Sequence, residues 1–114
     1  MGQAIQNKSF HFAVRVTKLC RYLQKEQQEF VITKQLLRSG TSIGANVSEA
    51  QQAQSRADFI SKLNIALKEA CETDYWLRLL QETDYLSAVE FQSIYSDCQE
   101  LERLLVSIVK KSKK

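Results

Sequence analysis

The residues that could carry chemistry are few and widely separated. His11 is the only histidine, and no flanking pattern makes it part of a Ser-His-Asp or Cys-His pair. Glu69 and Glu72 lie three residues apart and could share a helix face, but the Glu-x-x-His motif of di-iron bundles is absent. Residues 39–44 contain two glycines without the Gly-Lys-Ser/Thr of a phosphate-binding loop. We therefore expect no enzyme activity, no metal and no other cofactor.

The three cysteines indicate a reducing compartment. Cys20, Cys71 and Cys98 are odd in number and widely spaced, so a disulfide framework is not expected. Cys20 and Cys98 fall on apolar helical positions and Cys71 flanks one, which predicts three small buried side chains. The polar stretch 1–9 lacks the apolar core of a signal peptide, and no apolar run is long enough to span a membrane. We predict a cytoplasmic protein that makes no membrane contact.

Charge is distributed unevenly along the 114 residues, although the net charge is only +3. Five basic residues precede the first acid and five follow the last, so all 13 acids lie between two wholly basic ends. This asymmetry favours an anionic partner. The alternative is a solvated helix face and a solubilising tail, but such surfaces usually mix both signs. The predicted phosphate contacts are Arg15, Lys18, Arg21, Lys25, Lys110, Lys111, Lys113 and Lys114.

Four amphipathic helices would position these side chains. Apolar residues recur with helical period over roughly 9–27, 33–53, 56–83 and 88–110, followed by a basic C-terminal tail. Thr33, Ser55 and Ser87 are candidate N-caps, and Ser87 forms a capping box with Glu90. Residues 39–44 could form a loop, but the unbroken apolar spacing around them favours helix. Two glycines four residues apart would then let a neighbouring helix approach closely.

The connections between these helices are short, which makes sequential helices antiparallel neighbours. With no proline and only three glycines, a turn-rich β fold is not expected. The sequence predicts an all-α, up-down-up-down four-helix bundle that forms a single domain over residues 1–114. The start of the first helix would lie near the end of the fourth, so the C-terminal lysines would join the basic end of the first helix.

Two stripes outside the core positions predict self-association. The third helix carries a second apolar stripe whose residues would be a liability on a monomer. That stripe consists of Ile65, Trp76 and Leu79, with Glu69 and Glu72 among them and Tyr75 beside it. The second helix carries a mostly uncharged stripe suited to a hydrogen-bonded interface, formed by Gln35, Ser39, Ser42, Asn46 and Glu49. The alternative is that Trp76 caps the core and the serines face water.

The second and third helices resemble a known family. Residues 35–50 (QLLRSGTSIGANVSEA), 59–63 (FISKL) and 72–80 (ETDYWLRLL) are similar to the bacterial four helix bundle protein family. Its best-known relatives are encoded within intervening sequences of large-subunit ribosomal RNA genes. Residues 7–10 (NKSF) also fit, and the fourth helix fits loosely. The resemblance implies a bundle that assembles into a ring-like homopentamer.

The same resemblance implies kinship with the accessory protein of diversity-generating retroelements, a basic pentamer that binds nucleic acid and the reverse transcriptase. Most members of the family have no established activity, and no catalytic residue carries over. The signature positions carry over as structural or interface residues: Gln35, Arg38, Ser39, Ser42, Asn46 and Glu49.

The sequence as a whole predicts a non-enzymatic homo-oligomer that binds nucleic acid, RNA in preference to DNA. Contacts to phosphates carry no base information, so little sequence specificity is expected. Repetition of the basic patch in an assembly would raise the avidity. The competing prediction is a protein-interaction scaffold whose partner is another polypeptide. An enzyme is a third possibility, for which a pocket near Glu69 or Glu49 would hold the substrate.

Overall fold

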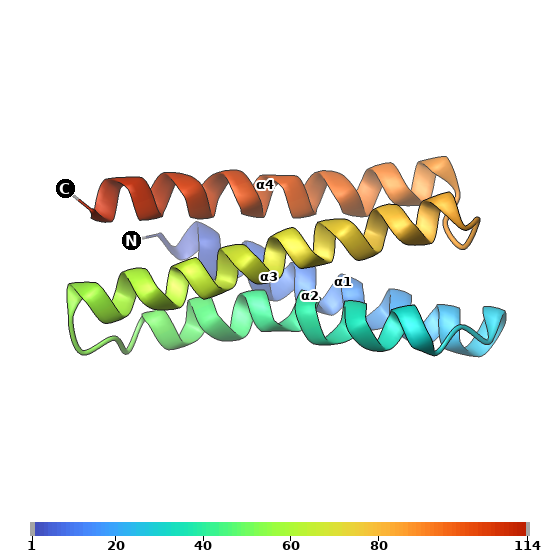
Figure 1. Ribbon diagram of the computed structural model, residues 1–114, viewed down its shortest axis with the longest axis horizontal. Helices are drawn as coiled ribbons and strands as arrows, with labels where there is room; N and C mark the ends of the chain where they lie inside the picture. The colour runs from blue at the N-terminus through green and yellow to red at the C-terminus, as the bar shows by residue number, and fades with distance from the viewer. Residues whose placement is uncertain (1, 114) are drawn as a thin grey trace.

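Four helices account for nearly all of residues 2–113, the part of the chain that the structure, a computed structural model, describes. They are α1 (Gln3–Gln27), α2 (Val31–Ala50), α3 (Arg56–Glu82) and α4 (Ala88–Ser112). Consecutive helices run in opposite directions, and the first turn of α1 lies at the same end as the last turn of α4 (Figure 1). Each helix packs against two others, so α1 and α3 occupy diagonal corners. This arrangement confirms the predicted all-α four-helix bundle.

The first two helices begin earlier than the sequence predicts. α1 starts at Gln3 instead of residue 9, and Ile5 extends its buried side by one turn. α2 starts at Val31 and ends at Ala50, so Thr33 is not its N-cap. The Glu29 carboxylate instead accepts hydrogen bonds from the first three backbone N–H groups of α2, at 2.8–3.2 Å. A buried acid therefore satisfies the donors that a helix start leaves unpaired.

The predicted caps of α3 and α4 are confirmed. The Ser55 hydroxyl accepts from the backbone N–H of Asp58 at 3.0 Å, while the Asp58 carboxylate accepts from the backbone N–H of Gln54. At the start of α4, Ser87 and Glu90 exchange side-chain and backbone hydrogen bonds in a complete capping box. These caps fix where the two helices that carry most of the acidic residues begin.

Residues 39–44 are helical, and their glycines bring α2 close to α1. A Cβ on Gly40 would lie 2.8 Å from a methyl of Val16, and one on Gly44 would lie 3.2 Å from the Ser9 carbonyl oxygen. The side chains with apolar period fill the interior, including Phe12, Leu23, Ile43, Leu63, Leu77, Cys98 and Leu105. Within residues 2–113, no helix has the length and continuous apolar character that crossing a membrane requires.

Candidate nucleic-acid interface

The basic residues of α1 divide into a paired flank and an unpaired outer row. On the flank that faces α4, Lys8 lies 3.2 Å from Glu100 and Arg15 lies 2.6 Å from Asp97. Arg15 also donates to the backbone oxygen and the hydroxyl of Ser93. The charge of this flank is therefore largely neutralised within the chain, and Arg15 is less available to a phosphate than the sequence predicts.

The outer row of α1 retains its positive charge. Lys18, Arg21 and Lys25 are exposed, and none of them forms an ion pair with another residue of the described range 2–113. They succeed one another at spacings of three and four residues, so they line one side of the helix. Phe10 and Tyr22 are exposed on the same helix, at 67% and 50%. Of these two rings, Tyr22 lies within the cationic row, whereas Phe10 lies two turns before Lys18.

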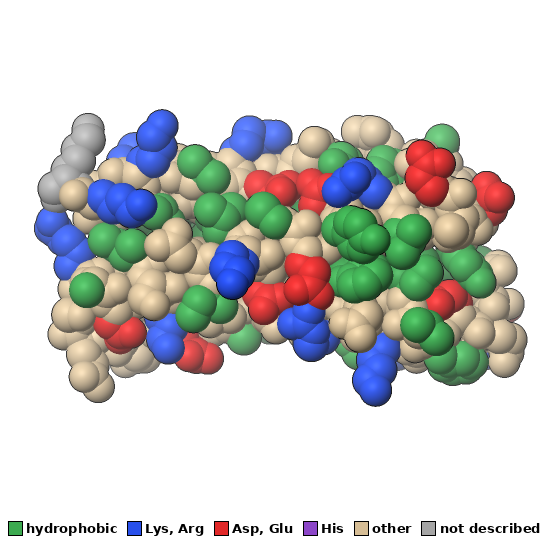
Figure 2. All heavy atoms as spheres, in the orientation of Figure 1, with side chains coloured by type: hydrophobic (Ala, Val, Ile, Leu, Met, Phe, Trp, Pro, Cys, Tyr) green, Lys and Arg blue, Asp and Glu red, His purple; other side chains and the backbone are tan. Residues whose placement is uncertain are grey.

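The C-terminal cations form a second, separate group. Lys110, Lys111 and Lys113 are exposed, as is Arg103, and Lys114 lies outside the described residues. Figure 2 shows Lys and Arg side chains over the C-terminal part of α4, toward the end of the bundle where α1 begins. The unpaired cations of α1 lie toward its other end, roughly 20–35 Å along a helix that rises 1.5 Å per residue. The prediction that the tail lysines join the basic end of α1 is therefore wrong.

The signature residues of α2 connect it to α3 within the same chain. Arg38 pairs with Glu69 at 3.2 Å and with Glu72, and the indole N–H of Trp76 donates to Glu72 at 3.0 Å. The hydrogen bonds from Trp76 and Arg38 lower the pKa of Glu72, and the bond to Glu72 raises the pKa of Arg38. Both carboxylates that could have bound a metal are engaged by one guanidinium.

Two residues of the α2 stripe, Ser39 and Glu49, contact α3 within the same chain. Ser39 is fully buried and accepts a hydrogen bond from the Thr73 hydroxyl at 2.9 Å. Ser42 and Asn46 bond to backbone oxygens one turn earlier, and Glu49 pairs with Lys62 of α3. Gln35 is half-buried on the same side. Because Ser39 is enclosed, its side chain is not available to a second chain, which fits the structural role among the two that the resemblance implies.

The second apolar stripe of α3 does reach the surface. Ile65 is 39% and Tyr75 50% exposed, whereas Trp76 and Leu79 are half-buried. Tyr75 and Trp76 meet edge to face with ring centroids 5.0 Å apart, and Trp76 also packs against the core. Figure 2 shows apolar side chains gathered over the neighbouring halves of α3 and α4. This surface combines a core-capping indole with apolar groups left in contact with water.

The sequence does not indicate the acidic pair that lies on the seam between α3 and α4. The Asp74 carboxylate accepts from the hydroxyl of Tyr95 at 3.0 Å and from Arg78 at 2.8 Å, and it shares a hydrogen bond with Glu102. Burial, followed by the hydrogen bond and the negative charge of Asp74, raises the pKa of Glu102 to about 7. The only signal in the sequence is one carboxylate on each of the two helices, and the register between α3 and α4 decides whether the two carboxylates meet.

The cysteines are poor nucleophiles. Burial raises the pKa of Cys20 to about 12, and it raises the pKa of Cys98 as well. Cys71 is exposed, so the prediction that all three are buried is wrong, yet partial burial and Glu102 still raise its pKa. In the described range no three His, Cys, Asp or Glu side chains are grouped as a metal site requires.

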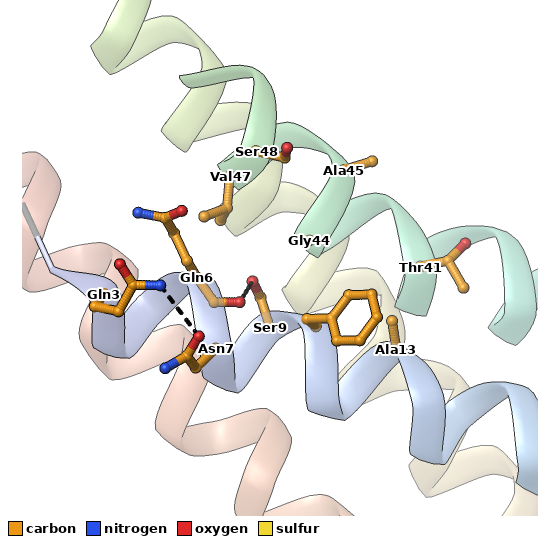
Figure 3. Close-up of a pocket in the computed structure, with 11 residues that line it drawn as sticks. Gln3, Gln6, Asn7, Ser9, Ala13, Thr41, Gly44, Ala45, Val47 and Ser48 are labelled. Carbon is orange, nitrogen blue, oxygen red and sulfur yellow. Dashed lines mark hydrogen bonds between the residues drawn. The ribbon is translucent and has the colours of Figure 1, made fainter. Parts of the chain in front are cut away.

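A neutral cleft of about 470 Å³ lies between the first turns of α1 and the C-terminal half of α2. Figure 3 shows its polar wall, where Gln3 donates to Asn7 at 3.3 Å and Ser9 donates to the Gln6 carbonyl at 3.1 Å. Phe10 lines it beside the small residues of α2, with its ring edge-to-face against exposed His11. No charged side chain lines this cleft, so it does not extend the cationic row.

Comparison with known proteins agrees with this architecture. Residues 3–107 match the family described as 23S rRNA-intervening sequence protein. The chain belongs to that family. A crystal structure from Bacteroides thetaiotaomicron, described as a protein of unknown function from the S23 ribosomal protein family, is 59% identical, with a TM-score of 0.92. The match covers 93% of this chain and 98% of that one. No curated protein matches the chain.

Membership in the intervening-sequence protein family confirms the resemblance that residues 35–50 and 72–80 indicate. The two segments form the α2–α3 pair, in which Arg38, Glu72 and Trp76 are joined. These two segments of the chain are therefore joined by a structural link between α2 and α3. The similar crystal structure is of unknown function, so the role of the cationic row rests on its own geometry.

Proposed function

We propose that this intervening-sequence protein is a non-enzymatic, homo-oligomeric nucleic-acid-binding protein of the bacterial cytoplasm, favouring RNA and reading little sequence. The observation that carries the proposal is the unpaired row of Lys18, Arg21 and Lys25 on the outside of α1. Ion pairs to α4 neutralise only the inner flank of that helix. Cations without partners in the protein retain their charge for phosphates, which supply most of the affinity in non-specific binding.

A binding assay with matched charge reversals tests this proposal. Fluorescence anisotropy of a labelled 20-nucleotide RNA would compare the natural protein with the double variants K18E/K25E and K34E/K68E. All four lysines are exposed and free of ion pairs within residues 2–113, so both variants change the net charge equally. We expect K18E/K25E to abolish binding and K34E/K68E, on α2 and α3, to weaken it only moderately.

Salt dependence provides a second, independent measurement. Three phosphate contacts per protomer predict that affinity falls roughly 20-fold between 50 and 200 mM salt, from the slope for single strands. Affinity that is insensitive to salt, or equal loss in both double variants, would contradict binding at the α1 row. A protein that binds no RNA or DNA at any salt concentration would favour the alternative, a scaffold for another polypeptide.

The assembly belongs to the same proposal. The apolar stripe of α3 leaves Ile65 and Tyr75 exposed, and burial against a second copy would remove this surface from water. The family resemblance supports a pentamer, whose mass would be about five times the 13.1 kDa of one chain. A reverse transcriptase is a further partner that the resemblance supports, and pull-down with the natural protein would test it.

Light scattering on two variants tests the α3 interface. Replacing Ile65 and Tyr75 by Lys should yield monomers, because two buried cations cannot be accommodated at an apolar contact. Replacing Val106 by Lys on α4, where the side chain is 44% exposed, should leave the assembled mass unchanged. A natural protein that is monomeric at micromolar concentration, or variants that all keep the same mass, would refute this interface.

A further inference from the structure

Tyr22 differs from the other tyrosines because its ring has no partner. Tyr75 packs against Trp76 and Arg78, Tyr95 stacks on Phe91 and donates to Asp74, and Tyr85 packs against the core. Tyr22 is 50% exposed, and within residues 2–113 its ring and hydroxyl make no ring contact or hydrogen bond. The core side of α1 is filled by other residues, and Tyr22 is not among them.

The neighbours of Tyr22 on the helix surface are two unpaired cations and the exposed acid Glu26, four residues after it. Lys18 lies one turn before it and Lys25 one turn after it, positions whose side chains are adjacent on a helix. Arg21 precedes it directly. Glu26, the first acid of the chain, lies just beyond Lys25 and marks the end of the row, so a polyanion would follow α1 between Lys25 and Lys18. An aromatic ring flanked by cations is the surface that binds single-stranded nucleic acid.

We propose that α1 binds single-stranded RNA, with phosphates along Lys18, Arg21 and Lys25 and an unpaired base stacked on Tyr22. This inference rests on the proposed function and narrows its substrate class. In a duplex the faces of the bases are covered by their neighbours, so cations alone would be used and the ring would contribute nothing. A single strand offers both the phosphates and a free base face.

The position of α1 in the fold keeps this surface available in an assembly. α1 and α3 occupy diagonal corners of the bundle and do not pack on each other. A copy that covers the outer face of α3 therefore does not by itself cover the outer row of α1 in the same protomer. Each copy in a ring would present one cationic row and one Tyr22, and a strand that reaches several rows would gain avidity.

The test separates the ring from the charge. Anisotropy would be measured with a labelled, non-self-complementary 20-nucleotide RNA, and with the same RNA annealed to its complement. Tyr22→Leu removes the aromatic face and Tyr22→Phe keeps it. We expect Tyr22→Leu to weaken single-strand binding roughly five- to tenfold, at the lower end of the range for one stacked base, with duplex binding unchanged. Tyr22→Phe should bind both probes as the natural protein does.

The remaining outcomes overturn the inference in two distinguishable ways. If the natural protein binds with normal salt dependence and Tyr22→Leu binds the single strand equally well, stacking is wrong and the proposed function stands. Equal losses on single strand and duplex would also refute stacking, because they would reflect a damaged helix. If the natural protein binds neither probe, the proposed function and the stacking inference fall together. Circular dichroism and thermal unfolding would confirm that Tyr22→Leu folds.

Discussion

Replacement of Gly40 by Ala tests the close packing of α1 on α2, which fixes how the cationic row is oriented. Gly40 is buried in the middle of α2, and a Cβ there would lie 2.8 Å from one methyl of Val16 and 3.0 Å from the other. Val16 is fully buried and β-branched, so its methyl groups cannot rotate away without disturbing the core. The two helices must therefore separate, or Val16 must leave its favoured rotamer.

The expected change in the free energy of unfolding of Gly40→Ala is the difference between two opposing effects. Adding a methyl group to a filled core costs about 1–3 kcal/mol, and replacing a helical glycine by alanine recovers about 1 kcal/mol. The net loss is about 1 kcal/mol, which lowers the melting temperature by about 4 °C for a domain of this size. In a Val16→Ala background the obstructing methyls are gone, so Gly40→Ala should stabilise by about 1 kcal/mol. The coupling between the two positions is then about 2 kcal/mol.

Urea unfolding followed by circular dichroism would measure all four members of this cycle. The protein concentration must be held constant, because self-association makes apparent stability depend on it. Gly44→Ala serves as a comparison, since its Cβ would approach the Ser9 backbone oxygen at 3.2 Å, a less severe contact. If Gly40→Ala stabilises the natural protein and the Val16→Ala variant equally, the helices are not in contact there, and the orientation of α1 derived from that contact is wrong.

Three further predictions concern single side chains. Glu29→Ala removes the carboxylate that caps α2 and should cost about 1–2 kcal/mol in urea unfolding. The pKa of Glu102 in the folded protein is about 7, above its ordinary 4.5. Protonation of this carboxyl therefore contributes its full stability to the folded protein below pH 4.5, and that contribution is lost as the pH rises through 7. After solvent screening, the stability lost is about 1 kcal/mol. The Glu102→Gln variant should not show this loss when its melting temperature is measured as a function of pH. In a thiol-labelling assay on the folded protein, exposed Cys71 should react while Cys20 and Cys98 stay protected. Three thiols that react alike would contradict this assignment. A melting temperature of the natural protein that does not change with pH would contradict the assignment of Glu102.

The helices could be predicted from the sequence because their signals are local. The apolar period and the hydroxyl caps at Ser55 and Ser87 belong to single segments, and the structure confirms both caps. The errors at the helix starts have physical causes. The first turns of α1 contain one buried apolar residue, Ile5, among polar neighbours, so no period is visible there. α2 is capped by Glu29, whose long side chain reaches forward from before the N-cap, which a search for Ser, Thr, Asp or Asn at the cap misses.

The candidate interface was predicted only in part, because charge pairing depends on helices far apart in sequence. The basic ends of the chain are visible in the sequence, but the pairing of Arg15 with Asp97 requires the register of α1 against α4. Likewise, the uncharged stripe of α2 indicates a hydrogen-bonded interface without saying with which helix. The contact between Ser39 and Thr73 shows that the partner is α3 of the same chain.

These ion pairs determine which faces of the bundle keep unpaired positive charge. Acids of α4 neutralise the inner flank of α1, and Glu69 and Glu72 of α3 neutralise Arg38, so neither seam is left strongly charged. The unpaired cations that are grouped together form the outer row of α1 and the C-terminal part of α4, toward opposite ends of a bundle 45 Å long. A net charge of +3 therefore understates the positive electrostatic potential near the outer row, because opposite charges cancel along the seams between helices but not on that row.

A polyanion that contacts both groups of one copy must run along the helix axis, whereas a shorter strand can engage only one of them. RNA length dependence should accordingly show a second gain in affinity once the strand can span the bundle.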